Sequence, residues 1–163
     1  MKPSAIWYLL AAGVFVLDQW SKIMILEWPA LAAQGEIVVT PFFNWVLAYN
    51  QGAAFSFLAD AGGWQRWFFI ALAFAVSVWI ALELHWHSGE KWLCLALALI
   101  MGGALGNVAD RLRFGAVVDF IQLHAAGFYW PAFNVADSAI TAGAVLLVGV
   151  VLRGTPRREK REP

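Results

Sequence analysis

Charged residues and cysteines are both scarce in this sequence, and each shortage excludes a class of protein. Only 13% of the 163 residues are charged whereas 61% are hydrophobic, which is too apolar a balance for a soluble domain of this length. Eleven basic and eleven acidic residues give a formal net charge of zero, so the chain lacks the basic surface that binds nucleic-acid phosphates. One cysteine, Cys94, excludes an internal disulfide, and with three scattered histidines it forms no metal-ligand spacing. We therefore expect a membrane protein without a metal, a cofactor or a nucleic-acid partner.

Four apolar stretches are each long enough to cross a bilayer as a helix, which takes about 20 residues. They cover about residues 5–26, 66–84, 92–112 and 135–153. An alternative for the first stretch is a cleaved signal peptide, because Ala30-Leu31-Ala32 fits a small-residue cleavage pattern. Asp18 and Lys22 argue against it, since they interrupt the apolar run well before that site.

Lysine and arginine near the ends of the spans predict their orientation, because basic residues resist translocation. Lys2 precedes the first span, Lys91 follows the second, and a basic tail at 154–163 follows the fourth. The connection 28–63 contains no basic residue. We therefore expect both termini in the cytoplasm, and 28–63 together with the end of the third span on the opposite side.

The connection 28–63 carries a strand pattern of its own. Residues 36–40 and 44–49 are rich in β-branched and aromatic side chains, with Pro41 between them and a turn at 50–52. The predicted fold is thus an α-helical integral membrane protein, a single domain over 1–153 with four transmembrane helices and a small extracytoplasmic β-sheet. The many aromatic rings of the connection 28–63 suit the membrane interface. Gly62-Gly63 could act as a hinge of this connection, which we state as a hypothesis.

Ionisable residues inside the spans are costly and need either a partner or a function. Asp18 and Lys22 lie four residues apart on one helical face, which is the spacing of an ion pair. Asn107, Asp110 and Arg111 share a face at the end of the third span. For both groups a structural role and a functional role remain open.

Two further acids suggest chemistry. Asp119 follows the third span and Asp137 begins the fourth, so both are expected near the non-cytoplasmic interface. A capping role at the helix start remains open for Asp137, but it cannot account for Asp119. Two carboxylates close together in a site of low dielectric share a proton, so that one acts as a base on water and the other as an acid. This pattern predicts peptide hydrolysis without a metal or a covalent intermediate.

Two other classes of protein compete with a protease. Buried acids such as Asp18 and Asp110 also mark proton paths in small proton-coupled transporters or channel components, although the inverted repeats of transporters are not visible here. Gly102 and Gly106 form a small-xxx-small pattern that lets another helix approach closely, as in a non-enzymatic assembly protein. That second alternative leaves Asp119 and Asp137 unexplained.

Five blocks of sequence, in this order and at these distances from the four spans, together resemble the bacterial lipoprotein signal peptidase family, also called signal peptidase II. The blocks are 18–22, 50–56, 102–112, 117–120 and 130–138, and the resemblance extends from about 14 to 141.

The resemblance implies an aspartic endopeptidase of the bacterial inner membrane. It would remove the signal peptide from prolipoproteins, cutting before a cysteine that carries diacylglycerol. The resemblance makes Asp119 and Asp137 the catalytic pair, active near the periplasmic face, and implies a β-cradle and a small helix from 28–63 over the site. Other family positions around the substrate and the inhibitor globomycin, or supporting them, are Asp18, Lys22, Asn50, Gly52, Asn107, Asp110, Arg111, Asn134 and Ala136.

The chemistry of the residues agrees with such a substrate. A bond next to a lipid-anchored cysteine lies near the headgroup level, which is the expected depth of the two acids. Asn50, Asn107, Asn134 and Arg111 are candidate donors to an oxyanion. The acyl chains can remain in membrane lipid and enter laterally between helices. The expected oligomeric state is a monomer, which the residues themselves do not determine.

Overall fold

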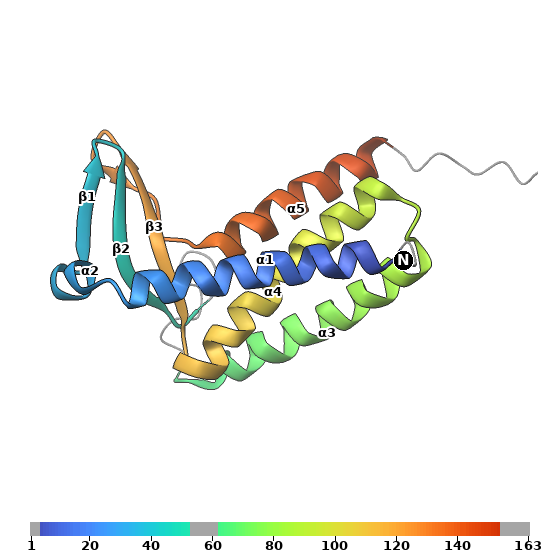
Figure 1. Cartoon of the computed structure of the whole chain (residues 1–163), viewed down its shortest axis with the longest axis horizontal. Helices are drawn as coiled ribbons and strands as arrows, with labels where there is room; N and C mark the ends of the chain where they lie inside the picture. Colours follow the sequence, from blue (N-terminus) through green and yellow to red (C-terminus); the bar gives the residue numbers. More distant parts are fainter. Residues whose placement is uncertain (1–3, 53–61, 154–163) are drawn as a thin grey trace, which may run out of the picture.

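The computed structural model describes residues 4–52 and 62–153, and within them it contains five helices and four strands (Figure 1). Their bounds are α1 Ala5–Leu26, α2 Pro29–Gln34, β1 Glu36–Thr40, β2 Phe43–Asn50, α3 Trp64–Trp86, α4 Lys91–Phe114, β3 Val117–Ala125, β4 Phe128–Tyr129 and α5 Val135–Arg153. Lys2, the basic tail and residues 53–61 lie outside the described residues, so the predictions that concern them have no counterpart here.

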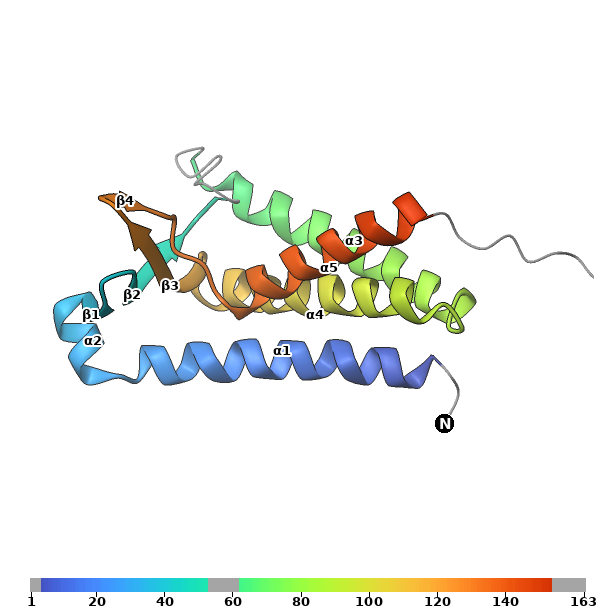
Figure 2. The same ribbon diagram turned by 90° about the horizontal axis from the view of Figure 1, so that it is seen from above.

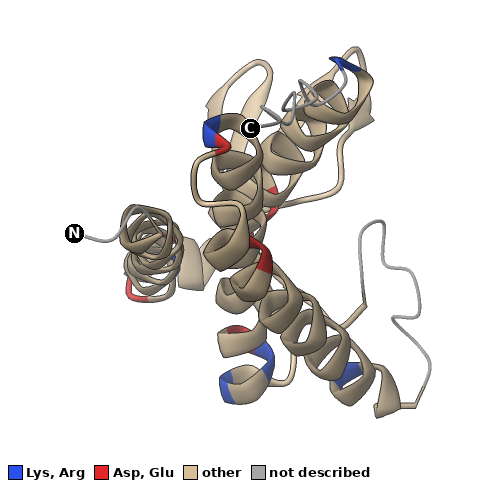
Figure 3. Cartoon of the chain, turned by 90° about the vertical axis from the view of Figure 1, so that its right-hand side faces the viewer, with Lys and Arg blue, Asp and Glu red and all other residues tan. Residues whose placement is uncertain are grey.

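Four of these helices, α1, α3, α4 and α5, are long and apolar enough to cross a membrane. The predicted fold of four transmembrane helices with a small sheet is therefore confirmed. The bounds of α1 and α5 agree with the predicted ranges, whereas α3 and α4 each extend by one or two residues at both ends. α4 ends where Gly115 adopts a left-handed conformation, with φ of 78°, which glycine adopts without strain. Figure 3 shows that charged residues occupy few positions along the helices.

Glycines on α4 allow two neighbouring helices to approach it closely. A Cβ atom at Gly102 would lie 2.5 Å from the carbonyl oxygen of Ala11 in α1, and one at Gly106 would lie 2.5 Å from Oδ2 of Asp18. On another side of α4, a Cβ atom at Gly103 would lie 2.5 Å from the carbonyl oxygen of Ala136 in α5. The small-xxx-small pattern thus joins helices of the same chain, with α4 as the most buried of the four spans.

The sheet lies at one end of the bundle and is antiparallel, in the order β1-β2-β3-β4 (Figures 1 and 2). Its first two strands confirm the pattern expected at 36–40 and 44–49. Its other two strands lie within 117–129, where the sequence analysis identified 117–120 as a motif and predicted no strand. The pairing of β2 with β3 sets Ala48 opposite Asp119, so the sheet itself positions one of the two predicted catalytic acids.

The short helix α2 contributes to packing at the sheet end. Leu31 of α2 is fully buried and clusters with Ile25 of α1 and Phe120 of β3. No residue of α2 lines the cavity described below, and residues 53–61 lie outside the described residues, so the small helix expected over the site stays a prediction. Gly62 and Gly63 have positive φ angles of 77° and 96°, compatible with the proposed hinge, but a motion remains a prediction.

Candidate active site

A cavity of about 1010 Å³ opens where the sheet meets the ends of α4 and α5. Both Asp119 and Asp137 line it, and for brevity we call these two residues the cavity pair. The predicted residues Asn50, Gly52, Asn107 and Arg111 also line it, whereas Asp18, Lys22, Asp110, Asn134 and Ala136 do not. The remaining wall is largely apolar and is formed by Ala48, Tyr49, Val117, Trp130, Pro131, Ala132, Phe133, Ser138, Ile140, Thr141 and Ala142.

Asp137 reaches the cavity from the first turn of α5, and Asn134 fixes its position. The side-chain oxygen of Asn134 accepts a hydrogen bond from the backbone N–H of Asp137 at 2.9 Å. In return, the backbone N–H of Asn134 donates to Oδ2 of Asp137 at 3.3 Å. This reciprocal pattern is a capping box, so the capping role that the sequence left open is real. It does not use Oδ1 of Asp137, which is available for other contacts.

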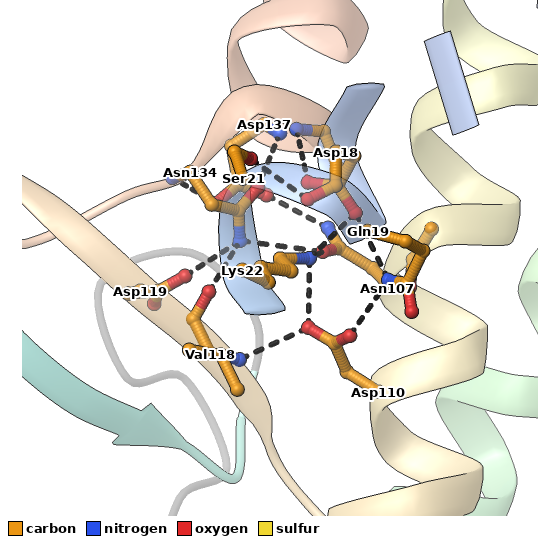
Figure 4. A network of polar contacts seen from close by, with 12 residues as sticks. Asp18, Gln19, Ser21, Lys22, Asn107, Asp110, Val118, Asp119, Asn134 and Asp137 are labelled. Carbon is orange, nitrogen blue, oxygen red and sulfur yellow. Dashed lines mark hydrogen bonds and ion pairs between the residues drawn. The ribbon is translucent and has the colours of Figure 1, made fainter. Parts of the chain in front are cut away.

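Two amide side chains connect the cavity pair (Figure 4). Nδ2 of Asn134 donates to Oδ1 of Asp119 at 2.7 Å, and Nδ2 of Asn107 donates to Oδ1 of Asp137 at 2.8 Å. The amides also contact each other, since Nδ2 of Asn134 lies 3.3 Å from Oδ1 of Asn107. Each carboxyl group therefore has an amide donor, and the described residues form no ion pair with either.

The environment of Asp119 favours its protonated form. The pKa of Asp119 is raised from 3.8 to about 7, first by burial and second by the nearby charge of Asp137. Hydrogen bonds from Asn50 and Asn134 oppose the rise in pKa, as does the charge of Lys22. Near neutral pH Asp119 can thus hold a proton beside a second carboxyl group, and paired acid and base chemistry needs one proton shared in this way.

Asp18 and Asp110 lie behind the cavity with the Lys22 ammonium group between them, and we call these two acids the bridged pair. Nζ of Lys22 lies 2.8 Å from Oδ2 of Asp18 and 2.7 Å from Oδ2 of Asp110. All three side chains are at most 2% exposed. The ion pair predicted from the spacing of Asp18 and Lys22 is present, but its second acid comes from α4. Lys22 also donates to Oδ1 of Asn107 at 3.2 Å.

Gln19 belongs to this network and was missed in the sequence analysis. Its side-chain nitrogen lies 3.2 Å from Oδ2 of Asp18, 2.9 Å from Oδ1 of Asp110 and 3.2 Å from the carbonyl oxygen of Gly106. Helical periodicity relates Asp18 to Lys22 but leaves the adjacent position on a different face, so spacing did not single Gln19 out. The signal that could have identified Gln19 was its position within 18–22, the first of the five blocks that resemble the family.

Arg111 connects the end of α4 to the turn at 50–52. Its Nη2 donates to the carbonyl oxygen of Gly52 at 2.7 Å and its Nη1 to that of Asn107 at 3.3 Å. The guanidinium carbon lies 5.1 Å from the ring centroid of Phe69 in α3, a cation–π contact. Asn50 shapes the same turn, because its side-chain oxygen accepts from the backbone N–H of Gly52 at 3.0 Å. Gly52 therefore contributes through its backbone.

Ala136 contributes through its position next to Asp137. It is fully buried, and its backbone N–H donates to Oδ1 of Asp18 at 2.9 Å. A larger side chain here would press on α4, since the Ala136 Cβ lies 3.5 Å from where a Cβ of Gly106 would be. Over residues 4–52 and 62–153, no three His, Cys, Asp or Glu side chains are grouped as metal ligands would be.

The fold and the site define a polytopic membrane protein whose cavity is equipped for acid and base chemistry. A family model described as signal peptidase (SPase) II matches residues 10–153, and the chain belongs to this family.

Similar proteins agree with this assignment. The lipoprotein signal peptidase of Ralstonia nicotianae is 57% identical over 152 residues, which are 93% of this chain and 86% of that protein. The lipoprotein signal peptidase of Azoarcus sp. is 50% identical over 158 residues, which are 96% of this chain and 88% of that protein. A solved bacterial membrane enzyme structure superposes with a TM-score of 0.80 at 28% identity, covering 98% of this chain and 94% of its own.

Proposed function

We propose that this chain removes the signal peptide from diacylglyceryl-modified prolipoproteins, cutting before the lipidated cysteine by an aspartic mechanism. Membership of the signal peptidase II family supports the peptidase activity and the substrate class. The observation that supports the aspartic mechanism is the cavity pair, in which Asp119 is buried and has a pKa of about 7. The transporter alternative receives no support from these similarities.

In the proposed reaction, Asp137 is the base and Asp119 is the acid. The Asp137 carboxylate accepts two hydrogen bonds and lies at the amino end of α5, where the helix dipole favours negative charge. It removes a proton from a water molecule, whose oxygen attacks the scissile carbonyl carbon while Asp119 gives its proton to the carbonyl oxygen. Asp137 then passes its proton to the leaving nitrogen, Asp119 takes back the proton of the carbonyl oxygen, and the C–N bond breaks.

The side-chain amides of Asn107 and Asn134 donate to the two carboxyl groups, so we do not assign them to an oxyanion hole. The Nδ2 group of Asn134 is shared among Asp119, Asn107 and the carbonyl oxygen of Val118. That of Asn107 donates to Asp137. We therefore assign stabilisation of the developing oxyanion to protonated Asp119 and to the nearby positive charge of Arg111, in place of the amide donors suggested by the sequence.

The cavity wall supports a substrate that arrives from lipid. Ile140, Thr141 and Ala142 on α5 and Trp130 and Pro131 before it form a mainly apolar side of the cavity. Lateral entry along this side would leave the diacylglyceryl chains in the membrane and bring the adjacent peptide bond to the cavity pair. Globomycin, an inhibitor expected from the family resemblance, would compete for this space.

We propose that the cavity faces the periplasm and that both termini face the cytoplasm of a bacterial inner membrane. The basic residues Lys91 and Arg153 lie at the end of the bundle opposite the sheet (Figure 2). At the sheet end, Arg111 is buried and Arg66 donates to the carbonyl oxygen of Leu112. Labelling of single cysteines at Glu27 and His87 in a Cys94→Ala background, with a membrane-impermeant maleimide on spheroplasts, tests the orientation. Labelling at 87 rather than 27 would contradict it.

Cleavage by the purified protein tests the proposed function. We expect a diacylglyceryl-modified prolipoprotein to be cut, an unlipidated precursor to be cut much more slowly, and globomycin to inhibit. The alkaline side of the pH profile should fall through a pKa of about 7, because Asp119 must be protonated to act as the acid. Failure to cut the lipidated substrate, or equal cutting of both precursors, would contradict the proposal.

A further inference from the structure

Lys22 lies behind the cavity, where its ammonium group joins three acceptors. Nζ lies 2.8 Å from Asp18, 2.7 Å from Asp110 and 3.2 Å from Oδ1 of Asn107. An ammonium group has three hydrogens, so these three contacts use all of them. Lys22 is 2% exposed and does not line the cavity, so it has neither access nor a free donor for a substrate.

Each acid of the bridged pair holds the backbone next to one member of the cavity pair. Oδ1 of Asp18 accepts from the backbone N–H of Ala136 at 2.9 Å, one residue before Asp137. Oδ2 of Asp110 accepts from the backbone N–H of Val118 at 3.1 Å, one residue before Asp119. Because Lys22 binds both acids, it connects the first turn of α5 to the first residues of β3.

Lys22 also fixes the direction of the Asn107 amide. With Oδ1 of Asn107 facing the ammonium group, Nδ2 faces Oδ1 of Asp137 at 2.8 Å. A reversed amide would direct its carbonyl oxygen at the carboxylate and its NH₂ group at the ammonium, and both contacts would be repulsive. The charge of Lys22 therefore keeps a donor on Asp137.

We infer that Lys22 is a positioning residue for the proposed reaction, which sets the separation of the cavity pair and the direction of the Asn107 amide through the bridged pair. The inference rests on the proposed function of the cavity pair. Lys22 acts through Asp18, Asp110 and Asn107 and does not touch the reacting atoms.

A change in pH profile follows from the charges around Asp119. The charged groups that face Asp119 are Asp137 from α5, Lys22 from α1, and Asp110 and Arg111 from α4. The charge of Lys22 lowers the pKa of Asp119. Loss of Lys22 should therefore move the alkaline limb of the pH profile to higher pH, which a loss of folded protein would not do.

The test compares Lys22→Met with the double variant Lys22→Met/Asp110→Asn in the full chain. The single variant leaves two buried carboxylates without their cation and is expected to fold poorly. In the double variant one carboxylate remains, so the formal charge of these three positions stays at −1, as with the two carboxylates and one ammonium of the parent. An asparagine at 110 can still accept from Val118 through its side-chain oxygen. Lys91→Met, at an exposed position at the other end of α4, is the matched control.

We expect kcat of the double variant to fall about 100-fold per folded molecule with little change in KM, because a displacement of about 1 Å at the reacting groups has this effect. Folded protein is counted by binding of a non-cleavable lipidated peptide. The alkaline limb of Lys22→Met should move to higher pH, and Lys91→Met should behave as the parent. Parental kcat in the double variant, or an unmoved limb in the single variant, would overturn the inference.

Two further arms complete the test. If the parent does not cut the lipidated substrate, the proposed function fails and the inference fails with it. If the parent cuts and the double variant is fully active, only the inference is refuted. If the Lys22 variants do not fold, Gln19→Ala decides, because it removes a donor shared by Asp18 and Asp110 without removing any charge. We expect a decrease in kcat of about 10-fold, within the range for one hydrogen bond to a charged group, and an unchanged kcat would overturn the inference.

Discussion

The bridged pair and the cavity pair are two sets of carboxyl groups at the same end of one bundle, and they differ in what lies between their members. The ammonium group of Lys22 lies within 2.8 Å of both Asp18 and Asp110. Between Asp119 and Asp137 lie the neutral amides of Asn107 and Asn134. A cation allows both acids beside it to be ionised, whereas amides leave two carboxylates that repel each other.

The difference explains how buried acids in one protein can serve opposite purposes. The bridged pair shares the positive charge of Lys22, and through it the two acids hold the backbone N–H groups of Ala136 and Val118 in place. The cavity pair has no cation between its members, and burial of Asp119 together with the nearby charge of Asp137 raises the pKa of Asp119, which favours a retained proton. The retained proton is what makes the cavity pair suitable for catalysis.

The largest expected effect separates the two pairs directly. Asp119→Asn and Asp137→Asn should each lower the rate of cleavage by about 1,000-fold or more, because each removes the acid or the base. Asp18→Asn keeps a side-chain oxygen for Ala136 and should lower the rate by no more than about 100-fold. Cleavage of the lipidated prolipoprotein by purified variants measures this. Glu27→Gln, an exposed acid at the same end, is the control. Equal effects in both pairs would remove the distinction between them.

The second effect concerns Asn134, whose amide lies between the members of the cavity pair as Lys22 lies between those of the bridged pair. Asn134→Ala removes the donor to Asp119 and the cap of α5, so we expect cleavage to fall about 10- to 100-fold and stability to fall by about 1 kcal/mol. Asn134→Ser keeps a good capping residue but is too short to reach Asp119 from the same position. It should keep more of the stability than Asn134→Ala while losing cleavage. Thermal midpoints and rates in detergent distinguish the two variants, and equal stabilities would argue against the capping role.

A third prediction disturbs the bridged pair from α4. In Gly106→Ala the new Cβ would lie 2.5 Å from Oδ2 of Asp18, so Asp18 has to move away from its partners. We expect a loss of stability of about 1–3 kcal/mol, as for other overpacked sites, with a lower rate of cleavage. Gly13→Ala in α1 is the control, because nothing lies within 4 Å of its new Cβ. A Gly106→Ala variant as stable as the control would show that the packing of Asp18 against this position can accommodate a methyl group.

A final expected effect is a pH dependence of stability that belongs to the cavity pair. The pKa of Asp119 is about 7 in the folded chain, above its usual 3.8, so between these values the folded state holds a proton that the unfolded state has lost. Stability from this residue is therefore lost as pH rises, by about 1.4 kcal/mol per unit of pKa difference. Asp119→Asn does not titrate, so its thermal midpoint relative to the parent should rise between pH 4 and pH 8. A difference that stays constant with pH would contradict the raised pKa.

The four spans and the first two strands could be predicted because their signals are local. Apolar runs of about 20 residues identify α1, α3, α4 and α5, and β-branched residues identify β1 and β2. The third strand was missed, although Val117, Val118 and Ile121 favour a strand, because its partner β2 is about 70 residues earlier in the chain. No local pattern relates positions so far apart.

The candidate site was predictable to a similar extent. The positions of Asp119 and Asp137 relative to the spans indicated a pair at one interface, and the family resemblance supplied Asn107 and Asn134 without their contacts. The contact between Lys22 and Asp110 was missed, because helical spacing relates Lys22 only to residues of its own helix.

The sequence by itself determined that this chain belongs in a membrane, where its spans begin and end to within a few residues, and which acids need an explanation, since hydrophobicity and the cost of buried charge act at each position alone. Only the tertiary structure decided which acid receives a cation and which receives an amide. That choice depends on distances between α1, α4, β3 and α5, which close packing at Gly102, Gly103 and Gly106 sets. It is also the choice that distinguishes acids that hold the protein together from acids suited to chemistry.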